Sequence, residues 1–181
     1  MKEYDLCAGY QMKVHNIGLY HPKSRSNEKH DAFSARILNF KDGCPDALNY
    51  FYEYCKTHPY LKNNSSAVLV CVPGHVPRKT YGPLQKLADK LSQDFCTYLP
   101  NALKRTRKID KLSSGGNRSL SVHLQSLEVD CAGIRGKMVV ILDDVTTTGK
   151  SLKACEKKLE TCRPNSIRAI VFGKTADQEV S

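Results

Sequence analysis

Two adjacent acids followed by hydroxyl and glycine residues form the segment of this chain best suited to chemistry. Asp143 and Asp144 come directly after the apolar residues 139–142. The phosphate-binding candidates follow them: Thr146, Thr147, Thr148, Gly149, Lys150 and Ser151. A helix beginning there would offer unpaired N–H groups and a positive dipole end to a phosphate. Because the carboxylates would repel that phosphate, we expect them to face sugar hydroxyls or a hydrated Mg²⁺.

The ending Gly149-Lys150-Ser151 also resembles the end of an ATP-binding P-loop. That motif requires a glycine five residues before its second glycine, and Asp144 stands at that position. An acid there would lie where the backbone must wrap anionic phosphates. The spacing therefore argues against a P-loop nucleoside triphosphatase.

A basic stretch at residues 104–118 is a second candidate for contact with an anion. It contains six cations and the single acid Asp110, and it ends in the glycine- and serine-rich residues 113–117, which predict an exposed mobile loop. Such a stretch could also be a solvated loop, or it could contact nucleic acid phosphates. It has no aromatic residue on which a base could stack, which weakens single-strand binding.

The elements that position these residues can be predicted from hydrophobic periodicity. The continuous apolar run at residues 67–72 and the apolar-rich segments at 138–142 and 166–172 predict strands buried in the sheet. Apolar residues at three- and four-residue spacing predict helices over 45–57, 82–96 and about 152–159. Short mixed segments at 9–14, 35–40 and 98–103 predict further strands. This alternation predicts a central, mainly parallel sheet flanked by helices.

Length and composition are those of a globular protein of one domain with a small appended part. The chain has 181 residues, 28 Lys and Arg against 18 Asp and Glu, and a formal net charge of +10, which favours an anionic partner. No apolar run approaches the ~18 residues of a membrane span, and the first residues lack a signal-peptide core. We therefore expect a cytoplasmic protein that does not contact a membrane. Its eight cysteines form no CxxC pair and are expected to be free thiols, with Cys71 and Cys155 in the core.

Residues 139–152, VVILDDVTTTGKSL, resemble the phosphoribosyl pyrophosphate motif of type I phosphoribosyltransferases. The last two-thirds of the chain are similar to the ComF-like, amidophosphoribosyltransferase-like branch of that family, through AVLVCVPGH, LKRTRKIDKL and NRSL. The chain departs from that branch in lacking a paired-cysteine zinc finger and an Arg-Gly-Phe-Asn run. The resemblance implies a small N-terminal hood over residues 1–64 and a phosphoribosyltransferase core over residues 65–181.

The resemblance also implies a role for each matching residue. Asp143 and Asp144 would bind the ribose hydroxyls, and residues 146–151 the 5-phosphate. The loop Pro73, Gly74 and His75 would lie beside the pyrophosphate, which Lys104, Arg105 and Arg107 would neutralise. Mg²⁺ would bridge oxygen atoms of the bound phosphoribosyl pyrophosphate. Asp143 and Asp144 are the protein residues that could also contribute to its coordination.

The reaction implied is Mg²⁺-dependent phosphoribosyl transfer from phosphoribosyl pyrophosphate to a nucleobase or an amine. His75 and His123 are the candidates for the general base. The alternative is a non-catalytic phosphoribosyl-ligand sensor or a DNA-uptake-associated module, in which nucleic acid is a secondary partner. A homodimer and the identity of the acceptor are left open.

Overall fold

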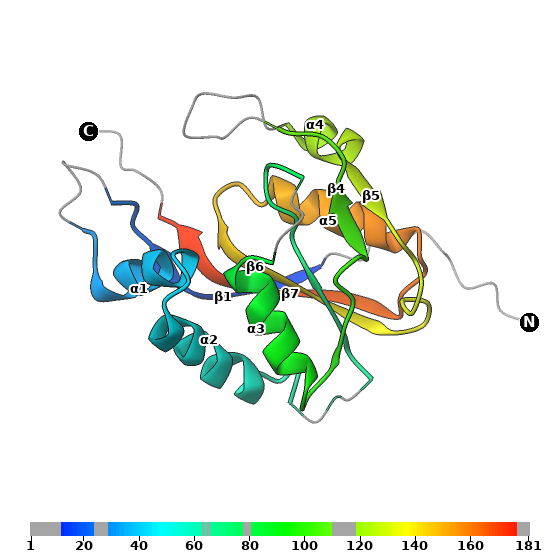
Figure 1. Ribbon diagram of the computed structural model, residues 1–181. Helices are drawn as coiled ribbons and strands as arrows, with labels where there is room; N and C mark the ends of the chain where they lie inside the picture. The colour runs from blue at the N-terminus through cyan, green and yellow to red at the C-terminus, as the bar shows by residue number, and fades with distance from the viewer. Residues whose placement is uncertain are drawn as a thin grey trace, which may run out of the picture.

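The central element of the fold is one parallel sheet, seen in a computed structural model that describes residues 12–23, 29–62, 64, 66–77, 81–109 and 119–176. Its strand order is β1-β7-β6-β2-β3, and every neighbouring pair is parallel. The strands are β1 (Lys13–Tyr20), β2 (Val68–Cys71), β3 (Thr97–Tyr98), β6 (Met138–Thr146) and β7 (Ser166–Thr175). An antiparallel pair, β4 (Leu103–Arg105) and β5 (Leu127–Val129), stands beside it (Figure 1). The predicted mainly parallel sheet is confirmed.

Helices cover both faces of this sheet. Side chains of α1 (Ala32–Lys41), α2 (Pro45–Thr57) and α3 (Pro83–Ser92) pack with Val140 and Leu142 of β6. Side chains of α5 (Lys150–Glu160) pack with Val139 and Ile141 on the opposite face, next to α4 (Leu120–Gln125). Because side chains alternate along a strand, the central strands need apolar residues at every position, which explains the continuous apolar runs. Among the described residues, every helix is too short or too polar to span a bilayer.

The strand predicted at residues 35–40 is wrong, because that segment lies inside α1. Asp31 begins the helix by accepting a hydrogen bond from the Ser34 N–H at 2.7 Å, and Gly43, with φ of +83°, follows its end. Ile37 and Phe40, three residues apart, are its buried side chains. These are helix start and stop signals, and a short apolar run on its own does not separate a helix from a strand.

The N-terminal part of the chain contributes directly to the central sheet. The strand predicted at residues 9–14 lies later, as β1, and it pairs with β7 along its length, from Lys13 beside Arg168 to Tyr20 beside Thr175. Positions 9–11 are outside the described residues. The described residues before position 65 thus supply an edge strand and two packed helices, and the division into a hood (1–64) and a core (65–181) stays a prediction.

The predicted strand at residues 98–103 is divided between two sheets. Tyr98 ends β3, residues 100 and 101 form a turn, and Leu103 begins β4 in the separate antiparallel pair. The basic stretch that follows begins as strand β4 and not as the exposed loop predicted for residues 104–118. Leu103 and Arg105 are buried while Lys104 between them is exposed, as the alternation of a strand requires.

A disulfide joins Cys131, in the segment after β5, to Cys162, just beyond α5. The expectation of free thiols is therefore wrong for this pair, whose Cα atoms lie 5.0 Å apart although 31 positions separate them. The five other described cysteines are free, and Cys71 and Cys155 are buried as predicted. Cys7 is outside the described residues.

The strand order reverses direction between β2 and β6. From β2 the chain continues to β3 on one side, whereas from β6 it continues to β7 on the other. In open α/β sheets, ligands bind at such a switch point, beside the carboxyl ends of the strands. Here that point lies between Cys71 and Leu142, which are paired in the register of the two strands.

Candidate functional site

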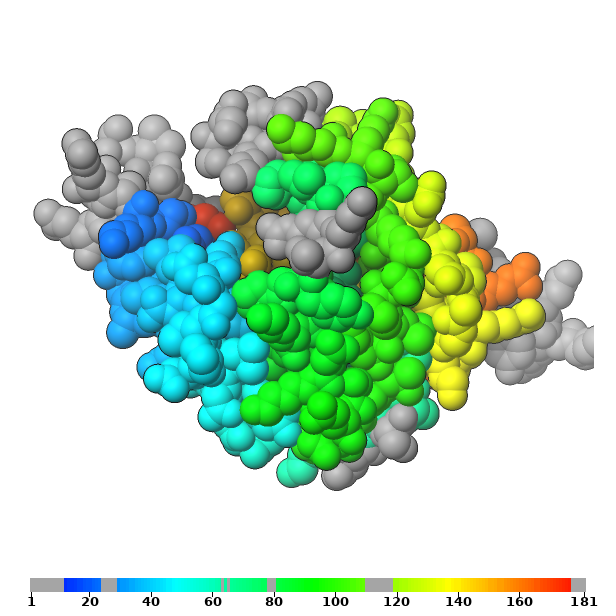
Figure 2. All heavy atoms as spheres, in the orientation of Figure 1, coloured from blue at the N-terminus to red at the C-terminus, as the bar shows by residue number. Residues whose placement is uncertain are grey.

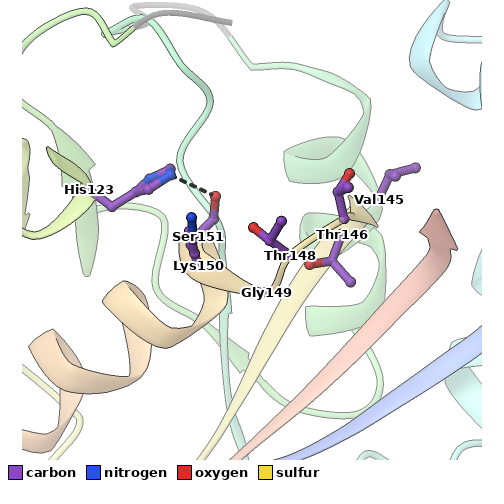
Figure 3. Close-up of a pocket in the computed structure, with 8 residues that line it drawn as sticks. His123, Val145, Thr146, Thr148, Gly149, Lys150 and Ser151 are labelled. Atoms are coloured by element: carbon purple, nitrogen blue, oxygen red, sulfur yellow. Dashed lines mark hydrogen bonds between the residues drawn. The ribbon is translucent and has the colours of Figure 1, made fainter. Parts of the chain in front are cut away.

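The predicted phosphate loop links the end of β6 to the start of α5. Gly149 is the residue before the helix and has φ of +71°, a left-handed conformation that glycine adopts without a steric penalty. A cavity of about 60 Å³ is lined by Val145, the predicted residues 146–151 and His123 (Figure 3). This volume suits a single polar group such as a phosphate better than a whole nucleotide.

The two acids lie at the end of β6 but face opposite sides of the sheet. Asp143 is 8% exposed, and its Oδ1 accepts a hydrogen bond from the Asp144 N–H at 3.0 Å. Asp144 is half-buried, and its Oδ1 lies 3.6 Å from Nζ of Lys41 at the end of α1. Successive side chains of a strand point in opposite directions, so the two carboxylates have different surroundings.

The predicted pyrophosphate loop begins beside these acids. The Val72 N–H donates to the Leu142 carbonyl at 2.9 Å, so Pro73 and Gly74 leave β2 next to the point where Asp143 ends the buried part of β6. The Ile109 N–H donates to the His75 carbonyl at 2.9 Å, which ties the loop to the basic segment. The structure thus brings together the acids and the 73–75 loop, which are 70 residues apart in the sequence.

Arg105 is hydrogen-bonded to the backbone of this loop. Its guanidinium donates to the Gly74 carbonyl at 3.0 Å, the Pro73 carbonyl at 3.3 Å and Ser126 Oγ at 2.6 Å, and the residue is 6% exposed. These contacts tie Arg105 to the backbone of the loop, and its predicted role of neutralising the pyrophosphate stays a prediction.

The other predicted cations have different positions. Lys104 is exposed and lines, with Pro73, Gly74 and Tyr81, a second cavity of about 270 Å³. Arg107 is exposed and donates to Gln125 Oε1 at 3.0 Å. The remainder of the predicted basic segment, residues 110–118, is outside the described residues. The roles of these cations toward pyrophosphate stay predictions.

The buried thiols near the acids are not candidates for nucleophiles. Burial, followed by the nearby Asp143 carboxylate, raises the pKa of the Cys155 thiol to about 12. Burial also raises the pKa of Cys71 to about 12. Both groups are therefore neutral thiols at neutral pH and behave as small core residues.

Lys41 is a site residue that the sequence did not reveal. Its position depends on α1, which carries Lys41 in its last turn, whereas the sequence predicted a strand over residues 35–40 and no element for Lys41. In Figure 2 the gold atoms near residue 145 lie in a hollow between the blue and cyan atoms of the N-terminal part and the green atoms of residues around α3. The ammonium group of Lys41, in the last turn of α1, lies 3.6 Å from Oδ1 of the second acid of the motif, Asp144.

Comparison with known proteins gives one family. The family described as "Phosphoribosyl transferase domain" matches residues 50–180. Two crystal structures of a hypoxanthine phosphoribosyltransferase from Staphylococcus aureus are similar to the chain, each over 79% of this chain and 70% of that one. The orthorhombic form has 15% sequence identity and a TM-score of 0.36, and the tetragonal form has 14% and 0.40. No curated protein matches the chain.

Proposed function

The chain belongs to the phosphoribosyl transferase domain family, whose members are pentosyltransferases, and from that premise we propose that it transfers a phosphoribosyl group from phosphoribosyl pyrophosphate to a nucleobase or an amine with the help of Mg²⁺. One observation carries the proposal. At the switch point of the sheet, the two acids near the carboxyl end of β6 lie between a loop at the start of α5 and the 73–75 loop after β2. A ligand with a phosphate, a diol and a pyrophosphate carries three groups in a matching order.

Each part of this site would hold one part of the donor. Residues 146–151 would bind the 5-phosphate through the first N–H groups of α5 and the Thr and Ser hydroxyls. The carboxylates of Asp143 and Asp144 would accept hydrogen bonds from the ribose hydroxyls. The 73–75 loop would lie along the pyrophosphate, with Lys104 and Arg107 as cations on the side of the departing group.

The reaction requires positioning more than covalent catalysis. The bond between the anomeric carbon and the pyrophosphate oxygen breaks, and its electron pair leaves with the pyrophosphate. The acceptor nitrogen forms the new bond to that carbon and gives up a proton. Positive charge develops on the sugar and negative charge on the leaving group, so a fixed carboxylate near the ribose and cations near the pyrophosphate both lower the barrier.

The residues present fit a magnesium ion held largely by the ligand. Within the described part of the chain, no three His, Cys, Asp or Glu side chains form a group that could hold a metal ion by themselves. Two neighbouring carboxylates, Asp143 and Asp144, can supply oxygen atoms, and Mg²⁺ characteristically completes its coordination with phosphate and water oxygens. When bound, the ion would neutralise charge on the pyrophosphate.

The finer assignments are part of the same proposal. We place the chain in the ComF-like branch because of its AVLVCVPGH, LKRTRKIDKL and NRSL segments. Between the two candidate bases, the structure favours His75, because it belongs to the loop beside the acids, whereas His123 lines the phosphate cavity. The acceptor would enter from the side of the N-terminal helices.

The double change Asp143→Asn and Asp144→Asn tests the site. Each amide loses a charge-assisted contact worth roughly 1.5–3 kcal/mol, so affinity for phosphoribosyl pyrophosphate should fall by about two orders of magnitude or more. Isothermal titration calorimetry with Mg²⁺ measures the affinity, and thermal unfolding verifies that the variant is folded. Asp130→Asn is the matched control, since this exposed acid lies after β5 and should leave affinity unchanged. Unchanged affinity in the double variant would refute the assignment.

A screen of bases and amines for pyrophosphate release tests the reaction. Release with one class of acceptor, lost in the double variant, supports the enzyme and identifies the acceptor. Tight binding of the donor without turnover, together with salt-sensitive DNA binding, would instead support the ligand-sensing or DNA-uptake module.

A further inference from the structure

His123 lies at the phosphate cavity although it belongs to a different part of the chain from the phosphate loop. Seven of the eight lining residues are the consecutive residues 145–151, and His123 is the eighth. Its Nε2 lies 3.5 Å from Ser151 Oγ, and the residue is 1% exposed. In Figure 3 the imidazole extends from α4 towards the first turn of α5, where Ser151 and Lys150 stand.

The fold fixes His123 in this position. Leu120 and Leu124 pack against the core on the α5 face of the sheet, and a helix places residue 123 on the same side as these two. The Ser126 hydroxyl bonds to the His123 carbonyl at 3.0 Å and also accepts a hydrogen bond from Arg105 at 2.6 Å. The short helix that carries the histidine is therefore fastened to the same arginine that holds the 73–75 loop.

We propose that His123 is a binding residue for the 5-phosphate, donating a hydrogen bond from Nε2 to a phosphate oxygen beside the Ser151 hydroxyl. This inference rests on the proposed function, since it assigns a further donor to the same phosphate. A phosphate at the start of α5 already meets backbone N–H groups, and an imidazole edge adds a donor from outside the loop, at the buried side of the cavity. A role in holding the 5-phosphate agrees with our preference for His75 over His123 as the general base.

The assignment predicts which part of the donor His123 recognises. Loss of the hydrogen bond from His123 to a charged phosphate oxygen should lower the affinity for the ligand about tenfold or more. This loss should appear with every ligand that carries a 5-phosphate. It should be absent with pyrophosphate alone, which would occupy the other end of the site.

The test compares ribose 5-phosphate, phosphoribosyl pyrophosphate and inorganic pyrophosphate, each with Mg²⁺, by titration calorimetry. His123→Phe keeps a ring in the buried position and removes the donor, whereas His123→Gln keeps a donor of similar reach. We expect His123→Phe to lose about tenfold or more for the first two ligands only, and His123→Gln to retain most of the affinity. Ser121→Ala, an exposed change in the same helix, is the matched control and should behave as the wild type.

The outcomes separate this inference from the proposed function. If the wild type binds ribose 5-phosphate and His123→Phe binds it equally well, the role of His123 is refuted while the function stands. If folded His123→Phe loses pyrophosphate to the same extent, His123 supports the fold of the site and is not a phosphate ligand. If the wild type binds none of the three, the proposed function fails and the role of His123 fails with it.

Discussion

Asp143 and Asp144 are chemically identical neighbours, but the strand that carries them makes them unequal. Asp143 is buried on the α5 side and already accepts one hydrogen bond from the backbone, whereas Asp144 is half-buried on the α1 side and lies near Lys41. A ligand diol would thus meet a fixed carboxylate and a second one whose partner is an ammonium group from the N-terminal part. Single changes at the two positions should consequently differ in effect.

Gly149 gives a prediction at the scale of one residue. Its φ of +71° is unfavourable for alanine by about 1–2 kcal/mol, while the space around it is open, so Gly149→Ala should lower the free energy of unfolding by about that amount. The strain lies in the loop that we propose binds the 5-phosphate, so affinity for ribose 5-phosphate should also fall. Urea unfolding and calorimetry measure the two effects.

Gly136 is the matched control for this prediction. It has φ of +69° and equally open surroundings, but it lies in the turn before β6, at the other end of that strand. Gly136→Ala should cost similar stability and leave ligand affinity unchanged. Equal losses of affinity in both variants would show that the loss reflects general destabilisation and not the geometry of the loop.

At the scale of elements, the β4–β5 pair acts as the support of the 73–75 loop. Alternation along β4 directs Leu103 and Arg105 inward, and β5 follows Ser126, whose hydroxyl accepts a hydrogen bond from Arg105. The loop that would face pyrophosphate is therefore held by a planar guanidinium that donates to Pro73, Gly74 and Ser126. A lysine carries the same charge but lacks this fork of donors.

Arg105→Lys keeps the positive charge, but it should weaken the attachment of the 73–75 loop because a lysine cannot donate to all of these acceptors at once. Loss of hydrogen bonds from a charged donor predicts a decrease in the free energy of unfolding of about 2 kcal/mol or more. Affinity for pyrophosphate should fall further than affinity for ribose 5-phosphate. The exposed Arg107→Lys is the control for stability and should change it by less than about 0.5 kcal/mol. A stable Arg105→Lys variant with normal pyrophosphate affinity would contradict the supporting role.

At the scale of the whole molecule, β1 and α2 meet in a cluster of histidine and tyrosine rings. His15 of β1 and His58, just after α2, pack edge to face at 4.6 Å, and His15 Nε2 bonds to Tyr54 Oη at 2.6 Å. Burial, with a further contribution from His15, lowers the pKa of His58 to about 4. The folded protein thus keeps His58 neutral where the unfolded chain would protonate it.

This cluster predicts that stability falls in mild acid. The unfolded chain binds the His58 proton near pH 6.5 and the folded chain near pH 4, so between these values unfolding takes up a proton. The contribution of neutral His58 to the free energy of unfolding is present above pH 6.5 and is lost as the pH falls towards 4. Between pH 7 and pH 5 this loss amounts to about 1–2 kcal/mol.

His58→Asn tests this dependence and keeps an acceptor for the Tyr60 N–H, which bonds to His58 Nδ1 at 3.2 Å. The variant should be less stable at pH 7 through lost ring contacts, but its unfolding free energy should decrease less between pH 7 and pH 5. Urea unfolding at the two pH values gives the stability difference at pH 7 and the decrease to pH 5 for each protein. Carboxylates that titrate in both proteins affect both decreases equally, so their effect is removed by the comparison. An identical decrease in the two proteins would exclude His58 as the cause.

The sequence by itself determined the features that depend on neighbouring residues. The apolar runs identified β2, β6 and β7, and the helical spacing identified α2, α3 and α5. The Asp-Asp-Val-Thr-Thr-Thr-Gly segment located the acids and the loop between β6 and α5 that we propose binds the 5-phosphate. Each of these signals is complete within about fifteen residues. A strand buried on both faces is apolar at consecutive positions, and a helix buried on one face is apolar every three or four residues. Both patterns can therefore be found in the sequence of the segment itself.

The tertiary structure alone decided the features that join distant segments. Arg105 belongs to a basic run in the sequence, but the pairing of β4 with β5 buries it beneath Pro73 and Gly74. Cys131 meets Cys162, Lys41 meets Asp144 and His123 meets Ser151 because the chain crosses the sheet between them. Strand order and helix docking minimise the exposed apolar surface of the whole chain, and no local spacing records which distant side chains that arrangement brings together.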